Sequence, residues 1–139
     1  MKLSTKSRYG ARAMIDLAQH YGKGPIKIHE ISSRQDVSEY YLQQILSTLS
    51  KANLVNSTAG SHGGFSLAIS PDKVTLLDIL EVLEGNLSLV NCVESPNQCD
   101  RSDDCCTRWA WCMVSDQLKN TLKNITLEQL TKKQKVPTV

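Results

Sequence analysis

Five cysteines lie within 21 residues of this chain of 139, and no cysteine occurs elsewhere. They are Cys92, Cys99, Cys105, Cys106 and Cys112. Thiolates gathered in one acidic segment indicate a metal site, a redox switch or stabilising disulfide bonds. Their odd number argues against a simple disulfide framework, because one thiol would be left without a partner.

The spacing of the first three cysteines narrows the choice of metal. Six residues separate Cys92 from Cys99 and five separate Cys99 from Cys105, unlike the paired two-residue gaps of zinc ribbons. Thiolates also hold iron–sulfur clusters. A helix that begins near Cys105 would stabilise its sulfur through the positive end of the helix dipole. Cys112 would sit roughly 10 Å farther along that helix, where a small buried hydrophobe is the simpler interpretation.

Composition bounds the fold and the compartment. The chain is 40% hydrophobic, which suffices for one packed domain, or for a small domain with an appended helical element. It shows no apolar leader and no apolar run near the roughly 18 residues of a membrane span, so we expect a cytoplasmic protein with no membrane partner. In a reducing cytosol, clustered cysteines are more often metal ligands or redox-active thiols than disulfides. No constellation suggests hydrolytic or transferase catalysis, so we expect no enzyme.

Charge is distributed unevenly along the chain. Residues 1–71 hold eight Lys/Arg and four Asp/Glu, a balance of +4, whereas residues 72–139 hold eight and ten, a balance of −2. A basic half can attract phosphate backbones and leaves the other half free to dimerise or to sense. Such an excess is also common on an ordinary solvated surface.

The hydrophobic spacing of the basic half predicts three helices. The first covers residues 5–21, with Ser4 or Thr5 as its N-cap and glycines as its stop signal. A short second helix spans residues 28–35, and Ser38 opens a third. In the third helix, four apolar residues recur at helical spacing: Leu42, Ile45, Leu46 and Leu49. Two short helices with a tight turn and a polar outer face are typical of a helix-turn-helix.

A β-hairpin is predicted directly after these helices. Residues 54–58 form one strand, the glycine-rich stretch 59–64 a turn, and Phe65, Leu67 and Ile69 the apolar face of a second strand. A hairpin after a recognition helix is typical of a wing, whose glycines would let the backbone approach a phosphate or a narrow groove. The alternative is an ordinary hairpin on a small α/β domain.

Helices are predicted on both sides of the cysteine segment. Residues 74–84 have a broad apolar face that should pack behind the winged domain. Residues 95–97 are expected to be non-helical because they contain Pro96, and a long helix should begin near Asp103, with Asp103 and Asp104 in its first turn. A short helix near residues 126–130 and a basic tail from Lys132, expected to be disordered, complete the chain.

The long helix carries an apolar stripe at spacings of three and four residues. The stripe consists of Trp111, Val114, Leu118, Leu122 and Ile125. Because no other domain remains for it to cover, it favours pairing with the same helix of a second subunit in a homodimer. The alternative is that the helix folds back on its own domain.

Several segments resemble a family of dimeric bacterial winged-helix regulators that includes the iron–sulfur cluster regulator IscR, the nitric oxide sensor NsrR and the cysteine metabolism regulator CymR. The resemblance covers residues 1 to about 130. It rests on the opening MKLSTK with Arg8-Tyr9, residues 38–44, Gly60 with Gly63-Gly64-Phe65, the spaced cysteines and residues 124–127.

This resemblance completes the expected organisation. The fold should be mainly α with a small β-hairpin wing, a winged helix-turn-helix domain plus a long dimerisation helix. The expected parts are a DNA-binding domain at 1–85, a cysteine-rich cofactor loop at 86–104, the dimerisation helix and a short C-terminal helix at 105–131, and a tail at 132–139.

The resemblance also implies an iron–sulfur cluster, 2Fe-2S in the first place and 4Fe-4S as the alternative. Its implied ligands are Cys92, Cys99 and Cys105. The fourth ligand departs from the family. Where IscR has a histidine this chain has Arg108, which cannot coordinate, and where NsrR takes an aspartate from the first helix it has Arg8. Cys106, which points roughly 100° away from its neighbour, and Cys112 could coordinate only if the helix start unwinds. The other options are a nearby carboxylate, a residue from another helix, water or a small thiol.

DNA contacts are expected on three elements. The candidate residues are Lys6 and Arg8 in the first helix, Ser38, Tyr40, Tyr41, Gln43 and Gln44 in the recognition helix, and Ser61 and His62 in the wing. Glutamine amides can pair with an adenine edge, while the basic residues would hold phosphates. Ala59 stands where the family commonly has an arginine, so wing readout should be weaker. A two-fold dimer predicts an imperfect palindrome in double-stranded DNA, with half-sites roughly 34 Å apart.

The leading hypothesis is a sequence-specific DNA-binding transcription regulator whose DNA affinity is controlled by an iron–sulfur cluster. A second hypothesis is a cluster-free winged-helix regulator that senses through a partner protein or thiol oxidation. A small iron–sulfur electron carrier or thiol oxidoreductase is the hypothesis from another class. The lack of a CxxC pair and the complete winged motif disfavour it.

Overall fold

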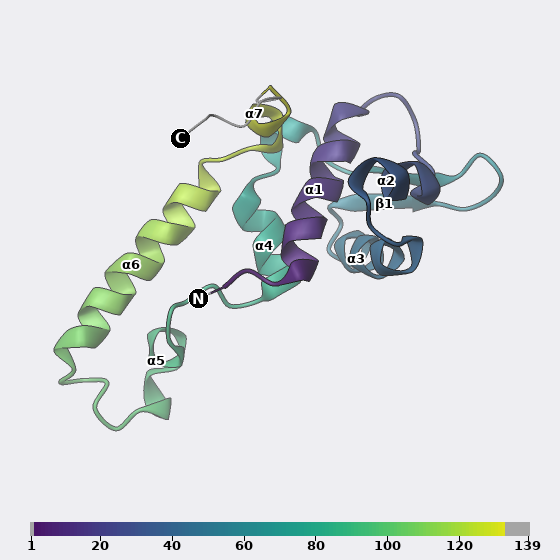
Figure 1. Cartoon of the computed structure of the whole chain (residues 1–139). Coiled ribbons are helices and arrows are strands. Elements are labelled where there is room, and N and C mark those ends of the chain that lie inside the picture. The colour runs from purple at the N-terminus through teal and green to yellow at the C-terminus, as the bar shows by residue number, and fades with distance from the viewer. Residues whose placement is uncertain (1, 133–139) are drawn as a thin grey trace.

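The computed structural model describes residues 2–132 and is mainly helical, with one two-stranded hairpin (Figure 1). Its elements, in chain order, are α1 (Thr5–Gln19), α2 (Ile28–Gln35), α3 (Glu39–Lys51), β1 (Val55–Thr58), β2 (Gly64–Leu67), the 3-10 turn η1 (Pro71–Lys73), α4 (Leu76–Glu84), α5 (Asn91–Glu94), the 3-10 turn η2 (Pro96–Gln98), α6 (Cys106–Lys123) and α7 (Leu127–Lys132). The predicted fold class is confirmed. The predicted disordered tail falls, beyond Lys132, outside the described residues.

Side-chain caps define where three of the helices begin. The hydroxyl oxygens of Ser4, Ser38 and Thr75 each accept a hydrogen bond from the amide three residues later, at 3.1, 3.2 and 3.2 Å. Each cap satisfies an amide that the helix itself leaves without an acceptor. The predicted starts of α1 and α3 are therefore confirmed, while α4 begins two residues later than its apolar pattern suggested.

The core of the winged domain forms where α1, α3 and the hairpin meet. The predicted apolar face of α3 is fully buried. It packs with α1 residues Ala13, Met14 and Leu17 and with hairpin residues Val55, Phe65 and Leu67. Close contacts also join α4 to α1 and α3, as predicted, so α4 closes the core from behind (Figure 1).

The hairpin is a short antiparallel ladder extended by a third segment. Val55 pairs with Leu67, and Ile26 exchanges two backbone hydrogen bonds of 2.8 Å with Phe65. The second strand ends at Leu67, so the prediction that Ile69 continues its buried face is wrong. Beyond Leu67 one more amide, that of Ala68, donates across the hairpin to Leu54 at 3.0 Å, and the chain then turns into η1.

Two wing glycines are required by the hairpin itself. A Cβ atom on Gly63 would lie 2.0 Å from the Thr58 carbonyl oxygen, and one on Gly64 would lie 2.3 Å from that of Ile26. Both contacts are with backbone atoms, which cannot move aside cheaply. The wing therefore folds tightly against the segment that leads into α2.

The C-terminal helix returns to the winged domain. Leu127 donates its amide to Val74 and Leu76 donates to Ile125, both at 2.9 Å. The Leu127 side chain is fully buried in the main core, and α7 packs beside α1. Both ends of α6 are thus tied, one to the winged domain through α7 and the other to α5.

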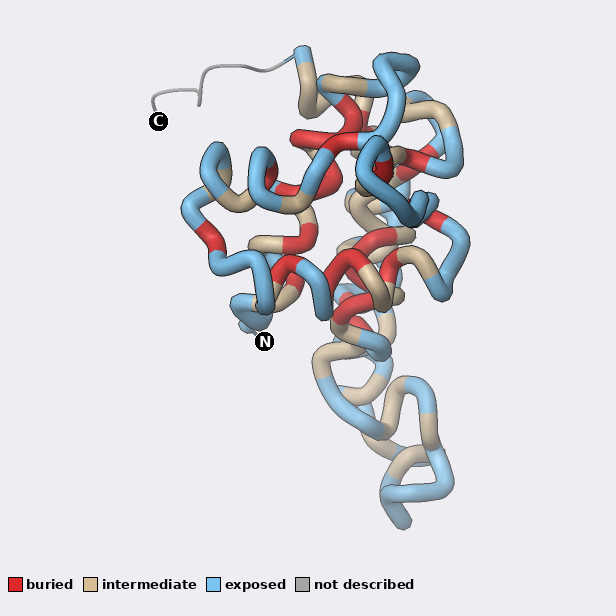
Figure 2. Tube along the Cα trace, turned by 90° about the vertical axis from the view of Figure 1, so that its right-hand side faces the viewer, coloured by how far each residue is buried: buried red, intermediate tan, exposed pale blue. Residues whose placement is uncertain are grey.

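The segment that carries the cysteines stands apart from the core. No residue from 91 to 114 is buried. In Figure 2 this segment lies below the buried core and has only the colours of intermediate and exposed residues. Contacts with α4 and α5 hold α6 to the rest of the described chain. No helix in the described range has the length and apolarity needed to span a membrane.

Two expectations for the cysteine segment are wrong. Residues 96–98 form a 3-10 turn, because proline suits the first position of a turn, where no amide donor is needed. α6 begins at Cys106 with Cys105 as its N-cap, so Asp103 and Asp104 do not lie in its first turn. They belong to a preceding turn, in which the amide of Asp104 donates to Arg101 at 3.1 Å.

A buried carboxylate links α1 to the end of α2. Asp16 is 1% exposed and accepts two hydrogen bonds from the Arg34 guanidinium, at 2.8 and 2.9 Å, and one from the Gln35 amide at 3.0 Å. Burial opposes ionisation of Asp16, but the hydrogen bonds and charge of Arg34 and the Gln35 amide outweigh it, and the pKa of Asp16 lies below its ordinary value. The carboxylate is therefore ionised at neutral pH.

We predict that Asp16→Asn lowers the free energy of unfolding at pH 7 by about 2 kcal/mol. The value is modest for a buried pair because Arg34 is 40% exposed and water screens part of its charge. The lowered pKa of Asp16 contributes stability that is fully present above its unfolded value of about 4 and is lost as pH falls through the lower folded value, so the penalty of the variant should be smaller at pH 3 than at pH 7. Urea unfolding at pH 7 and pH 3 measures both effects.

The matched control is Glu128→Gln, which alters the exposed ion pair of Glu128 with Lys132 on α7. Its effect should stay below about 0.5 kcal/mol. An Asp16→Asn penalty that is equally large at both pH values would contradict the assigned role.

Candidate functional site

The outer face of α3 presents polar side chains to solvent. Tyr40 is 77% exposed, and Gln43 and Gln44 are also exposed. The Gln43 amide donates to Ser47 at 3.1 Å, whereas the Gln44 side chain has no hydrogen-bond partner among residues 2–132. Gln44 is thus the more available of the two amides for an external hydrogen-bonding partner.

Tyr41 is held by α1 instead of projecting freely. Its ring meets that of Tyr9 edge to face, with centroids 6.1 Å apart, and the Arg12 guanidinium lies 5.4 Å above the Tyr9 ring. Arg12 also donates to Gln35 at the end of α2. This aromatic cluster fixes how α1 and α3 lie against each other, and it leaves Tyr41 half-buried.

The remaining predicted contact residues lie on three separate elements. Arg8 is exposed in the first turn of α1, where it donates to Thr5 at 3.3 Å, and Lys6 is half-buried beside it. Ser38 is exposed and used as the N-cap of α3, while Ser61 and His62 are exposed in the wing. Ser61 and the first residue of α3, Glu39, line one groove, so the wing turn and the start of α3 are neighbours.

The five cysteines are free thiols spread along the segment. Cys92 lies in α5, Cys99 follows η2, Cys105 caps α6, and Cys106 and Cys112 lie in α6. Cys99 and Cys106 are exposed and the others half-buried. Among residues 2–132, no three His, Cys, Asp or Glu side chains are close enough together to hold one metal ion. The described arrangement does not bring the three predicted ligands together.

Cys105 is the cysteine whose surroundings lower the pKa of its thiol. The Thr107 hydroxyl lies 3.1 Å from its sulfur, and this hydrogen bond, followed by that of the Arg108 amide, holds the pKa of Cys105 below its ordinary value. A lowered pKa raises the thiolate fraction, and the thiolate is both the nucleophile and the metal ligand.

Three polar contacts tie α5 and the residues before it to one face of α6. Arg108 Nε donates to the Cys92 carbonyl oxygen at 3.0 Å, the buried Ser115 hydroxyl accepts from the Leu89 amide at 3.2 Å, and Lys119 pairs with Glu94 at 3.1 Å. We call Arg108, Ser115 and Lys119 the α6 strap. Their helical spacing of seven and four residues is the only sequence signal for this strap, and Ser115 and Lys119 were not predicted as part of a site.

The strap bears directly on the expected cofactor. Arg108, which stands at the family's histidine position, holds the backbone of Cys92 with its guanidinium. A cation at that place cannot donate a lone pair to iron. The described residues therefore supply three candidate thiolate ligands, which they do not bring together, and no ligand at the position of the family's histidine.

The predicted dimerisation stripe is only partly covered. Trp111 and Val114 are 40% and 48% exposed, while Leu118 and Leu122 are half-buried. Large apolar side chains seldom gather at the surface of one helix without a partner.

An exposed polar helix beside a glycine-built wing defines the class of protein, a winged-helix DNA-binding transcription regulator. The chain belongs to the Rrf2 family, described as iron-dependent transcriptional regulators, whose sequence profile matches residues 3–133. The resemblance drawn from the sequence is confirmed.

Two relatives illustrate the range of the family. The chain is 40% identical to the HTH-type transcriptional regulator CymR of Bacillus subtilis over 130 residues, which are 94% of this chain and 89% of that protein. It is 35% identical to the HTH-type transcriptional regulator IscR of Sodalis glossinidius over 136 residues, 98% of this chain and 82% of that protein. Both relatives are named transcriptional regulators.

Solved structures of two members of the family have the same fold as this chain. The structure of CymR, called the global cysteine regulator of B. subtilis, has a TM-score of 0.81 at 38% identity, covering 97% of this chain and 99% of that one. The structure of T. potens IscR has a TM-score of 0.78 at 37% identity, covering 99% and 94%. Winged-helix regulators with both names therefore share this fold.

We predict that Arg108→Ala loosens α5 without unfolding the winged domain. Loss of one charged hydrogen bond should speed hydrogen exchange of the amides in residues 89–95 by about tenfold, while exchange in α1 and α3 stays unchanged. Arg101→Ala, which removes an exposed arginine from the same segment, is the control. Unchanged exchange of residues 89–95 in Arg108→Ala would show that the strap does not hold them.

Proposed function

We propose that this regulator binds an imperfect palindrome as a cytoplasmic homodimer, and that thiol chemistry in the cysteine segment adjusts its DNA affinity without a metal. The observation that carries the DNA-reading part is the exposed outer face of α3, which presents Tyr40 and Gln44 and whose first residue, Glu39, lines one groove with the wing. A glutamine amide offers the paired donor and acceptor that an adenine edge requires.

The proposed dimer rests on α6. Its apolar stripe is partly exposed, and the same helix on a two-fold axis would cover it. Two copies of α3 would then face successive major grooves, about 34 Å apart. The outward-facing residues of both copies would read the two half-sites of the palindrome.

The cluster-free form of control is supported by the strap and by Cys105. Arg108 holds the Cys92 backbone through a hydrogen bond that needs no metal, and the Cys105 thiol is biased towards its reactive form. A peroxide that oxidises the Cys105 thiolate to a sulfenic acid, with release of hydroxide, would enlarge and alter the side chain directly before α6 and so its junction with α5. A coupling of this kind is typically worth about 1–3 kcal/mol.

We predict that Gln44→Ala weakens binding to the preferred duplex by about tenfold, because one paired base contact is lost. Selection from a random DNA pool supplies that duplex, and a fluorescence titration measures the affinity. The affinity of Gln44→Ala for a scrambled duplex should equal that of the wild type. The control variant is Gln19→Ala, which changes an exposed glutamine on α1 and should bind the preferred duplex as the wild type does. Equal losses on both duplexes would contradict base reading by Gln44.

The second candidate is control by a 2Fe-2S cluster, with Cys92, Cys99 and Cys105 as ligands and Cys106 as a possible fourth. The family's description as iron-dependent and the relatives named IscR favour it. Iron and sulfide counts on protein purified without oxygen separate the two forms. We predict well under one iron per chain in the wild type and a higher count in Arg108→His, which supplies the missing ligand type. About two irons and two sulfides per wild-type chain would establish the cluster instead.

A further inference from the structure

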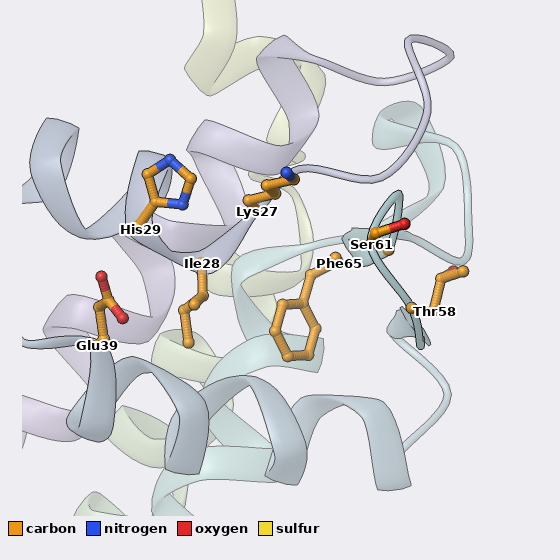
Figure 3. A pocket seen from close by; sticks show the side chains of 10 residues that line it. Lys27, Ile28, His29, Glu39, Thr58, Ser61 and Phe65 are labelled. Atoms are coloured by element: carbon orange, nitrogen blue, oxygen red, sulfur yellow. The ribbon is translucent and has the colours of Figure 1, made fainter.

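A groove of about 380 Å³ lies between the start of α2, the start of α3 and the wing. Figure 3 shows Lys27 and His29 on its α2 side, Glu39 at the start of α3, and Ser61 and Thr58 on the wing side, with the Phe65 ring between them. The groove therefore opens beside the proposed DNA-reading face and extends it towards the wing.

The α2 wall of this groove favours an anion. Lys27 and His29 are exposed, and neither makes an ion pair with a side chain of residues 2–132. Ile28 and His29 also occupy the first two positions of α2, where the helix leaves amide donors without acceptors. The Lys27 ammonium, the His29 imidazole and two backbone amides with no acceptor among residues 2–132 thus line the same wall.

The opposite walls are the uncharged wing and the start of α3. Gly64 packs its backbone against the Ile26 carbonyl, so the wing turn lies close to the segment that leads into α2. Glu39 brings a carboxylate to the α3 end, and it has no charged partner in the part of the chain that the structure describes. An anion should therefore sit on the α2 and wing side, where it is attracted by Lys27 and kept away from Glu39.

We infer that Lys27 and His29, with the Ser61 hydroxyl, bind the DNA phosphate backbone in this groove, while Glu39 limits the affinity. The inference rests on the proposed function, because the polyanion that α3 would present to the groove is DNA. Phosphate contacts of this kind position the duplex and carry no sequence information.

The test is a salt titration of the wild type, Lys27→Ala, His29→Ala and Glu39→Gln on the selected and the scrambled duplex. Lys27→Ala should weaken binding to both duplexes several-fold and reduce the slope of log affinity against log salt by about one. His29→Ala should weaken both in the same direction. Glu39→Gln should strengthen binding to both, because it removes a negative charge of similar shape. Lys123→Ala, an exposed lysine at the far end of α6, is the control and should leave affinity and slope unchanged.

The outcomes separate the two levels of the proposal. If Lys27→Ala and His29→Ala both keep the wild-type affinity and salt slope, the groove does not bind phosphate and this inference is refuted. The proposed function would still stand. A loss confined to the selected duplex in Glu39→Gln would make Glu39 a base reader and also refute this inference. A wild-type protein that prefers no duplex would overturn the proposed function and this inference together.

Discussion

The ion pair between Asp16 and Arg34 is the constraint on which the proposed DNA-reading surface depends. It fixes the end of α2 against α1, immediately before the turn in which Asp36 adopts a left-handed conformation and Ser38 starts α3. Gln35 strengthens the same junction by bonding both Asp16 and Arg12. Because only three residues separate α2 from α3, this buried ion pair helps to set the direction of the outer face of α3.

The cysteine segment is held in place by different interactions from those of the winged domain. Its residues are little buried, so polar contacts to the α6 strap replace a hydrophobic core in holding α5. Such regions open at low free-energy cost, which suits a part that responds to chemistry. The other end of α6 leads through the Ile125 and Leu127 backbone bonds into the winged domain. A change at Cys105 can therefore reach α4 and α1 along one continuous helix.

The sequence predicted the winged domain closely because its signals are local. The four apolar residues of α3, the caps at Ser4 and Ser38 and the paired glycines each point to one backbone conformation. Prediction was poorer for residues 95–104, where proline and aspartate permit several turns and no core selects among them. The guanidinium bond to the Cys92 carbonyl could not be predicted, because spacing alone does not show where a long side chain ends. The groove beside Lys27 needs three elements that only the tertiary fold brings together.

DNA affinity measured before and after metal removal tests most directly whether the reading surface is built without a cluster. Reduced protein would be stripped with a chelator, checked for residual iron and titrated with its selected duplex. We expect the dissociation constant to change by less than about twofold, because Asp16, Arg34 and the α6 strap hold the fold through protein contacts alone. Specific binding that disappears on stripping and returns only when the cluster is rebuilt would contradict this view.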